Sequence, residues 1–312
     1  MLMDAIASLS PCAREILHAG AKRLEPLHSA VSTPLLPVDH AYLIHYSRAK
    51  ERRAFQLQQL PLLGLNISVV VAYDRQEIGR EVLACTGLVD IGVPMLGTNL
   101  SIASEPAYLS QSLKLHVALY HMAIHGWRVA MILEDDVVVR WEYVGFFGAA
   151  VLNATAGRDP AGWLPRAKVH KWLDRPPVSA EYGFSVLFGG SYDPGGNDMV
   201  CCSDGPLANV TRPKPRDLRG FGMMPISGAA ITAASVQHVL RSLPFSNAYD
   251  IVLADSRVAS GNQSGQWLIK PCAFVPSAVL QKGKIVTHQH QVHERGKWLE
   301  YAKSEARRTG RL

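Results

Sequence analysis

A strand, a helix and a second strand follow one another near the start of the chain, and this order restricts the fold more than any other feature. Apolar runs over residues 41–46 and 67–72 predict two strands, and residues 47–60 carry apolar side chains at helical spacing. Such a βαβ unit implies a parallel sheet that is covered by helices on both faces. The sequence therefore predicts an α/β fold with a mostly parallel central sheet.

Further elements along the chain fit this class. We expect Ser104-Glu105-Pro106 to open a second long helix that Gly126 stops, followed by a fully apolar strand over 129–133. Later segments predict a short helix over 235–243 and strands over 184–188, 226–232 and 274–280. No clear period is visible over 145–182. Residues 191–225 are expected to form a long loop, which is the kind of segment that shapes a binding site over a rigid sheet.

Three regions are predicted along the chain. Residues 1–38 form an N-terminal helical extension and linker, in which Ser10 and Pro11 begin a helix. Residues 39–285 form the α/β domain. Residues 286–312 form a basic, polar C-terminal tail that contains His288, His290 and His293. These histidines are a candidate metal site, although the polar surroundings favour a surface tail.

Composition excludes several classes of protein. The chain has 312 residues, of which 48% are hydrophobic and 19% charged, so it is neither disordered nor collagen-like. A net charge of +6 permits an anionic ligand such as a nucleotide sugar, but it does not by itself indicate a nucleic-acid partner. No apolar run reaches the roughly eighteen residues that a membrane span requires.

Two observations on the cellular compartment point in different directions. No signal peptide is visible at the N-terminus, which favours a cytoplasmic protein unless a targeting segment is missing from this chain. However, five of the seven asparagines lie in N-x-S/T sequons, namely Asn66, Asn99, Asn153, Asn209 and Asn262. Because Ser and Thr are about a tenth of the residues, chance predicts about one such motif. The sequons favour a glycoprotein of the ER or Golgi lumen.

The five cysteines, at positions 12, 85, 201, 202 and 272, form no CxxC or zinc motif. Cys201 and Cys202 are each candidates to pair with a distant cysteine in an oxidising compartment. Buried or idle thiols explain them equally well.

An acidic triplet, Glu134-Asp135-Asp136, directly follows the apolar strand over residues 129–133. At the carboxyl end of a strand in an open α/β sheet, these acids lie where ligands bind. Carboxylate oxygens suit Mg²⁺ or Mn²⁺, and such ions commonly bridge phosphates. The triplet therefore predicts a divalent ion held against a diphosphate, whereas a solvated acidic turn is the alternative.

The triplet and its surroundings resemble glycosyltransferase family 25, which contains lipooligosaccharide and collagen galactosyltransferases. The resemblance covers about residues 40–282 and rests on Ile132-Leu-Glu-Asp-Asp-Val137, with weaker matches at residues 41–48, 184–191, 227–232, 247–250 and 275–281. Three positions depart from the family pattern. Ser104 replaces a glycine, no histidine directly follows Ser110–Ser112, and His45 stands where asparagine is usual.

The resemblance implies a GT-A, Rossmann-like fold and a DxD-type site. Asp136 would be the main metal ligand and Asp135 a second one, while Glu134 and Asp135 would hold the ribose, the sugar or a metal-bound water. Arg48, Arg52 and Arg53 are candidates to contact the nucleotide or its diphosphate. An exposed helix face explains these arginines equally well.

Direct inversion at the sugar needs a base that takes the proton of the acceptor hydroxyl. Asp250, which matches a family element, and Asp255 are the candidates for this catalytic role. Glu105 lies at a helix start, where an acid that compensates the helix dipole is the simpler explanation.

The sequence thus predicts a metal-dependent inverting glycosyltransferase that uses Mn²⁺ or Mg²⁺. It would move a hexose, with galactose or glucose expected, from a UDP-sugar to a hydroxyl of a glycan or protein acceptor. A catalytically inactive GT-A-fold binding protein is the main alternative. A nucleotidyltransferase or phosphohydrolase is a third hypothesis, although no P-loop or strand-linked GxGxxG motif is present.

Overall fold

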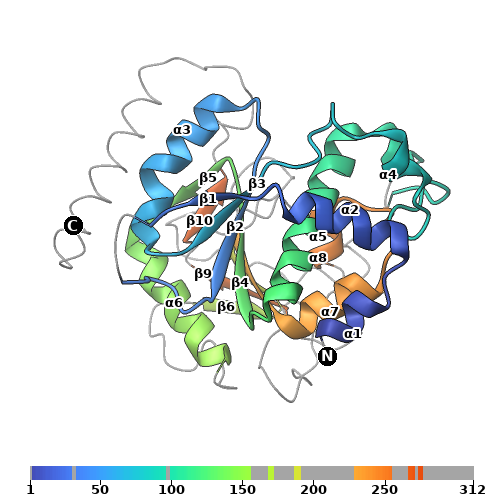
Figure 1. Cartoon of the computed structure of the whole chain (residues 1–312). Coiled ribbons are helices and arrows are strands. Elements are labelled where there is room, and N and C mark those ends of the chain that lie inside the picture. The colour runs from blue at the N-terminus through green and yellow to red at the C-terminus, as the bar shows by residue number, and fades with distance from the viewer. Residues whose placement is uncertain are drawn as a thin grey trace.

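One mixed β-sheet with helices on both faces forms the centre of the chain, as the computed structural model shows (Figure 1). The structure describes residues 2–29, 33–95, 99–155, 168–171, 186–190, 228–254, 266–270 and 273–276. The expected loop over 191–225 and the tail over 286–312, with its three histidines, lie outside the described residues. None of the described helices is both long and apolar enough to cross a membrane.

Five strands form the part of the sheet that carries the acidic triplet. Their order is β1 (Glu25–Leu27), β3 (Ile67–Val70), β2 (His40–Ile44), β4 (Val129–Glu134) and β8 (Gly228–Thr232). The sheet continues through β7 (Val186–Gly190), β9 (Gln266–Lys270) and β6 (Lys168–Lys171). A separate antiparallel pair joins β5 (Val137–Val139) to β10 (Phe274–Pro276). The described part of the chain is therefore an α/β fold, as expected.

The prediction of a mostly parallel sheet is wrong. Strand β2 is parallel to both β3 and β4, so the expected βαβ unit is present. Counted over the described strands of the main sheet, however, three pairings are parallel and four are antiparallel. Two of the four antiparallel pairings involve β8, which is a short, fully buried run, Gly-Ala-Ala-Ile-Thr. The apolar pattern of such a run does not indicate whether the strand is parallel or antiparallel to its neighbours.

Alternate residues of each strand face two separate hydrophobic cores. Tyr42 and Ile44 of β2 belong to one core, while Ala41 and Leu43 belong to the other. The first core includes residues of α1 (Leu2–Ala7), α2 (Pro11–Ala21), α4 (Arg80–Ala84), α5 (Pro106–His125), α7 (Ala233–Arg241) and α8 (Tyr249–Ala254). The second includes residues of α6 (Trp141–Thr155) and of the 3-10 turn η1 (Leu60–Leu63), which follows α3 (Lys50–Gln59). Figure 1 shows α2, α5 and α7 on one side of the sheet and α3 and α6 on the other.

Helix α5 is buried on nearly all sides because it lies between the sheet and the N-terminal helices. Pro106 begins the helix and Gly126 ends it in a left-handed conformation (φ 67°), as predicted. The contact with α2 is close. A Cβ atom on Gly20 would lie 2.5 Å from Val117 Cγ2, so no larger residue fits there without a shift of the two helices.

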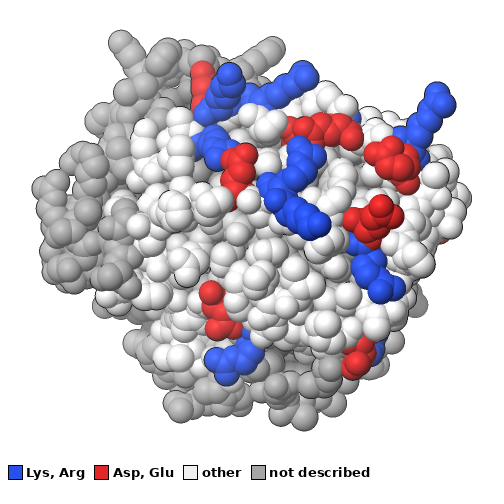
Figure 2. All heavy atoms as spheres, viewed as in Figure 1, with Lys and Arg blue, Asp and Glu red and all other residues white. Residues whose placement is uncertain are grey.

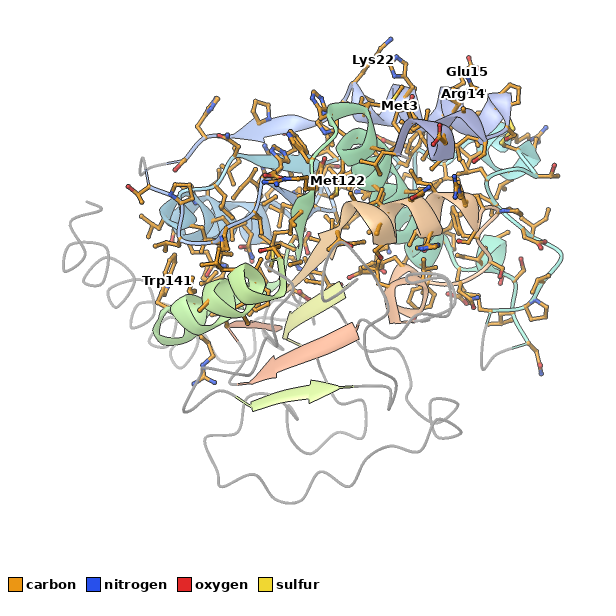
Figure 3. All side chains as sticks on the ribbon, turned by 90° about the horizontal axis from the view of Figure 1, so that it is seen from below. Met3, Arg14, Glu15, Lys22, Met122 and Trp141 are labelled. Carbon is orange, nitrogen blue, oxygen red and sulfur yellow. A yellow bond between two sulfur atoms is a disulfide. The ribbon has the colours of Figure 1, made fainter. Side chains whose placement is uncertain are left out.

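The N-terminal segment, which was expected as an extension, contributes to the same core as the sheet. Ser10 caps α2, as expected, by accepting a hydrogen bond from the Ala13 backbone N–H. Ala13 and Leu17 of α2 are fully buried, and β1 pairs with β3 at the edge of the sheet. Figure 3 shows charged side chains such as Arg14 and Glu15 on the outer surface of these helices, with Met122 of α5 in the interior.

Helix α6 covers the start of the stretch, residues 145–182, in which no period was predicted. The helix starts at Trp141, and its buried residues Trp141, Val144, Phe147, Ala150 and Val151 do recur at helical spacing. Two glycines inside the helix also lower its propensity. The predicted strand over 274–280 is confirmed as β10 for residues 274–276, and the remainder lies outside the described residues.

Candidate active site

The acidic triplet forms the tight connection between β4 and β5, at the carboxyl edge of the parallel strands. Glu134 is the last residue of β4 and pairs in register with Ile44, the last residue of β2. Asp135 and Asp136 form the turn that follows, and both are buried, at 6% and 7% exposure. Carboxylates at this depth need cationic or N–H partners.

Asp135 has such partners on both of its oxygens. Its Oδ2 atom accepts hydrogen bonds from His45 Nδ1 at 2.9 Å and from the Tyr46 backbone N–H at 3.0 Å. Its Oδ1 atom accepts one from Arg52 Nη1 at 2.8 Å. Burial alone would raise the pKa of the Asp135 carboxyl, but these donors and the Arg52 charge outweigh burial and hold the pKa below its ordinary value. Asp135 is therefore an ionised anchor inside the turn.

One face of helix α3 holds the turn in place. Arg52, Gln56 and Gln59 follow one another at helical spacing and all face the β4–β5 connection. Gln56 Nε2 donates to the carbonyl oxygens of Asp135 and Val137, each at 2.9 Å. Gln59 Nε2 donates to the Val137 carbonyl at 2.7 Å, and its Oε1 accepts the Val139 N–H at 3.1 Å. Side chains thus satisfy the backbone groups of this connection.

A second buried ion pair lies behind the turn. Lys114, in the middle of α5, donates to the Asp74 carboxylate and to the His45 carbonyl oxygen, and both ionic side chains are only 2% exposed. Asp74 also accepts hydrogen bonds from the Ser47 backbone N–H and hydroxyl. Burial by itself would raise the pKa of Asp74, but Lys114 and Ser47 lower it overall. The pair ties the loops that follow β2 and β3 to α5.

Helix α8 reaches the same turn from a distant part of the sequence. The Tyr249 hydroxyl donates to Glu134 Oε1, across a separation of 115 residues. Asp250, a predicted catalytic residue, follows Tyr249 as the second residue of α8. The Asp250 side chain lies outside the described residues, as does the whole of Asp255. The structure thus brings the backbone of Asp250 near the acidic triplet through its neighbour Tyr249, and the catalytic roles of Asp250 and Asp255 both stay predictions.

The three arginines predicted to contact the nucleotide have different positions. Arg52 pairs with Asp135, as described above. Arg53 pairs with Glu25 of β1 at the surface. Arg48 is exposed in the loop after β2, where Tyr46 also carries the Arg75 guanidinium over its ring at 5.0 Å from the centroid. Figure 2 draws the molecule in the view of Figure 1, and basic side chains lie over the upper part of that view, which includes α3.

The donor set at the turn suits a hard divalent ion that is completed by a substrate. No group of three or more His, Cys, Asp or Glu side chains within the described ranges is arranged to hold a metal. Mg²⁺ and Mn²⁺ sites that bind nucleotides often use one or two carboxylates and take their other oxygens from phosphates and water. Both oxygens of Asp135 accept hydrogen bonds, and Oε1 of Glu134 accepts the Tyr249 hydroxyl, so Asp136 is the carboxylate of the triplet that we consider first for such a site.

Comparisons with known proteins add no assignment. No family model matches the chain, and no curated protein matches it. The fold and the site described here therefore carry the functional argument.

Several residues of the site were missed in the sequence, although some left a signal there. Lys114 stands inside an otherwise apolar helical stretch, where an unpaired charge is unfavourable. Gln56 and Gln59 share the helical spacing of Arg52. Tyr249 and Asp74 gave no local signal, because their partners Glu134 and Lys114 lie far away in the sequence.

Proposed function

We propose that this chain is a glycosyltransferase that moves a hexose from a UDP-sugar to a hydroxyl group of a glycan or a protein. One observation carries the proposal. The acidic triplet lies at the carboxyl edge of the parallel strands β2 and β4, where ligands of α/β sheets bind, with its middle residue anchored inside and Asp136 buried beside it. The resemblance to glycosyltransferase family 25, with its GT-A fold, supports the same conclusion.

A divalent ion, Mn²⁺ or Mg²⁺, belongs to this proposal. Asp136 is its main ligand and Glu134 a second, while Asp135 positions the turn through His45 and Arg52. When bound, the ion supplies charge that neutralises the diphosphate leaving group. The alternative assignment of Asp135 as a ligand requires Arg52 or His45 to give up its hydrogen bond.

The other residues of the site hold the substrates and move a proton. Tyr249 fixes α8 against Glu134, so that Asp250 is the first candidate for the base that takes the acceptor proton, and Asp255 the second. The exposed Arg48 is a candidate contact for the diphosphate, because a guanidinium group matches phosphate oxygens. The sugar is transferred by direct displacement, with inversion at its anomeric carbon.

The compartment of action in this proposal is the lumen of the ER or Golgi. The structure adds a disulfide between Cys12 and Cys85, which joins α2 to the end of α4. Disulfides persist mainly in oxidising compartments, so the bond supports the same compartment as the sequons.

The test measures UDP release from a panel of UDP-sugars, with Mn²⁺ or with EDTA, for the full chain and for Asp136→Asn. We expect one UDP-sugar to be hydrolysed slowly and EDTA to abolish the reaction. The rate of UDP release by the variant should fall about 10²–10³-fold. Glu15→Gln, on the outer face of α2, is the matched control and keeps full activity. Asp250→Asn is expected to bind UDP and Mn²⁺ normally but to lose transfer.

Full metal-dependent turnover by Asp136→Asn would remove the metal assignment. If the wild-type chain releases no UDP and calorimetry detects no binding of UDP with Mn²⁺, the inactive binding protein becomes the better interpretation.

A further inference from the structure

Two of the sequon asparagines lie on the described surface with their side chains available. Asn66 and Asn99 are both exposed. Neither side-chain amide has a hydrogen-bond partner among the residues that the structure describes. Both therefore meet the first requirement for attachment of a glycan, which is access to the amide nitrogen.

Asn99 lies in the second of two neighbouring described segments, residues 90–95 and 99–101, that expose apolar side chains. Ile91, Val93 and Leu100 are 48%, 46% and 49% exposed, and Leu100 is the neighbour of Asn99. A cluster of exposed apolar side chains on a monomer normally has something to cover it.

Hydrogen bonds join the two described segments to each other. The Ser101 hydroxyl donates to the Ile91 carbonyl at 2.9 Å, and the Met95 N–H donates to the Leu100 carbonyl at 2.9 Å. Val89, just before the first segment, forms a bridge with Phe245, and its N–H donates to the carbonyl of Cys85 in the disulfide. A group attached to Asn99 therefore stands beside the apolar side chains rather than at a freely moving end.

Asn66 lies away from the candidate active site. Asn66 directly precedes β3 and is thus at the amino end of that strand, opposite the carboxyl edge that carries the acidic triplet. A large attached group at Asn66 therefore leaves the site open.

We infer that Asn66 and Asn99 are N-glycosylated, and that the glycan on Asn99 covers the exposed side chains of Ile91, Val93 and Leu100. In this reaction the asparagine amide nitrogen forms a bond to C1 of the first sugar of a lipid-diphosphate-linked oligosaccharide. The bond from C1 to the phosphate oxygen breaks, the lipid diphosphate leaves with the electron pair, and the amide loses one proton. The inference rests on the proposed secretory compartment and is independent of the transferase activity.

The test expresses the full chain behind a cleavable ER signal in insect or mammalian cells. The secreted protein is digested with peptide N-glycosidase in ¹⁸O water, which converts each glycosylated asparagine to a labelled aspartate. We expect the label at Asn66 and Asn99 in the peptide map. Asn66→Gln and Asn99→Gln each remove one step of the gel mobility shift, whereas Ser101→Thr, which keeps both the sequon and the hydroxyl, removes none.

Covering of these apolar side chains has a separate readout. Asn99→Gln should bind more of an apolar fluorescent dye than the wild type, and Asn66→Gln should not. Recovery of unlabelled Asn66 and Asn99 peptides from the secreted wild type would overturn the inference, and this result needs no variant to fold. Equal dye binding by the two variants would overturn the covering role. Neither result bears on whether UDP-sugars are turned over.

Discussion

The two ends of strand β2 each bury a histidine, but their surroundings differ. At the carboxyl end, the fully buried His45 side chain donates to ionised Asp135, next to Arg52 and close to the Lys114–Asp74 pair. At the amino end, His40 stacks on Trp127, with ring centroids 4.0 Å apart and planes inclined by 19°. Its Nε2 atom lies 2.9 Å from the Ser68 hydroxyl, and no ionised partner of His40 is found among the described residues.

The amino end is a packed aromatic cluster, composed of His40, Tyr42, His121, His125 and Trp127. Burial, and then the charges of neighbouring histidines, lower the pKa of His40 and of His121 to about 4. Both rings are therefore uncharged at neutral pH. The carboxyl end of β2 therefore lies among oriented charged side chains, whereas its amino end lies among packed, uncharged aromatic rings.

The largest effect is expected from breaking the buried pair at the carboxyl end. Lys114→Met leaves the Asp74 carboxylate buried without its cation, so we expect a loss of about 3–5 kcal/mol in the free energy of unfolding. Urea denaturation measures this loss. The double variant Lys114→Met/Asp74→Asn should lose less than the sum of the two single changes, because no charge is then left unpaired. A single variant within about 1 kcal/mol of the wild type would show that the pair has little effect on stability.

A pH titration should separate the two ends. For His40 and His121 the pKa in the folded state lies below the ordinary value of 6.5, so the unfolded chain binds protons first as the pH falls. Stability is therefore lost between pH 6.5 and about 4, by about 0.5–1 kcal/mol per pH unit for each ring after allowance for solvent screening. The pKa of Asp135 and of Asp74 is instead held below the ordinary value of 3.8, so their contribution persists until the pH falls below that value.

Melting temperatures from pH 7.5 to 3.5 test this order. His121→Gln should flatten the decline between pH 6.5 and 4 and leave the fall below pH 4 in place. An unchanged slope in that variant would show that protonation of His121 does not contribute to the loss of stability between pH 6.5 and 4. The buried His116, whose pKa burial also lowers to about 4, contributes in the same window, so His116→Leu provides the matched comparison.

How much of this arrangement the sequence predicts depends on whether the cause is local. The βαβ unit, the ends of α5 and the position of the acidic triplet at a strand end all depend on neighbouring residues, and these predictions are confirmed. The direction of β8 and the contact between Tyr249 and Glu134 depend on residues roughly a hundred or more positions away, which no local pattern records.

The candidate site shows the same division. Three acids in a row predict a charged turn but not which of them faces inward. In the structure Asp135 faces inward. Its hydrogen-bond donors His45 and Tyr46 come from the loop after β2, and Arg52 comes from α3. In the sequence His45 is only a departure from the family pattern, and its hydrogen bond to Asp135 supplies a physical reason for a ring nitrogen at that position.

The smallest expected effect sharpens the comparison within one helix. Arg52 and Arg53 are adjacent in α3, and both form ion pairs. The Arg52 side chain is 25% exposed and its partner Asp135 only 8%, whereas Arg53 and Glu25 are 32% and 47% exposed. Because water screens the second pair, Arg53→Gln should lower the free energy of unfolding by no more than about 0.5 kcal/mol. Arg52→Gln should lower it by about 1–1.5 kcal/mol, since Asp135 keeps His45 and the Tyr46 N–H.

Chemical denaturation of the two variants at pH 7 measures these losses, and their dependence on salt gives the second test. The Arg53 variant should lose its small difference from the wild type at high salt, because surface pairs are screened there, whereas the Arg52 variant should keep its difference. Equal losses for the two arginines would mean that Arg52 adds little to the hold on Asp135. The acidic turn would then be positioned mainly by His45 and the Tyr46 backbone.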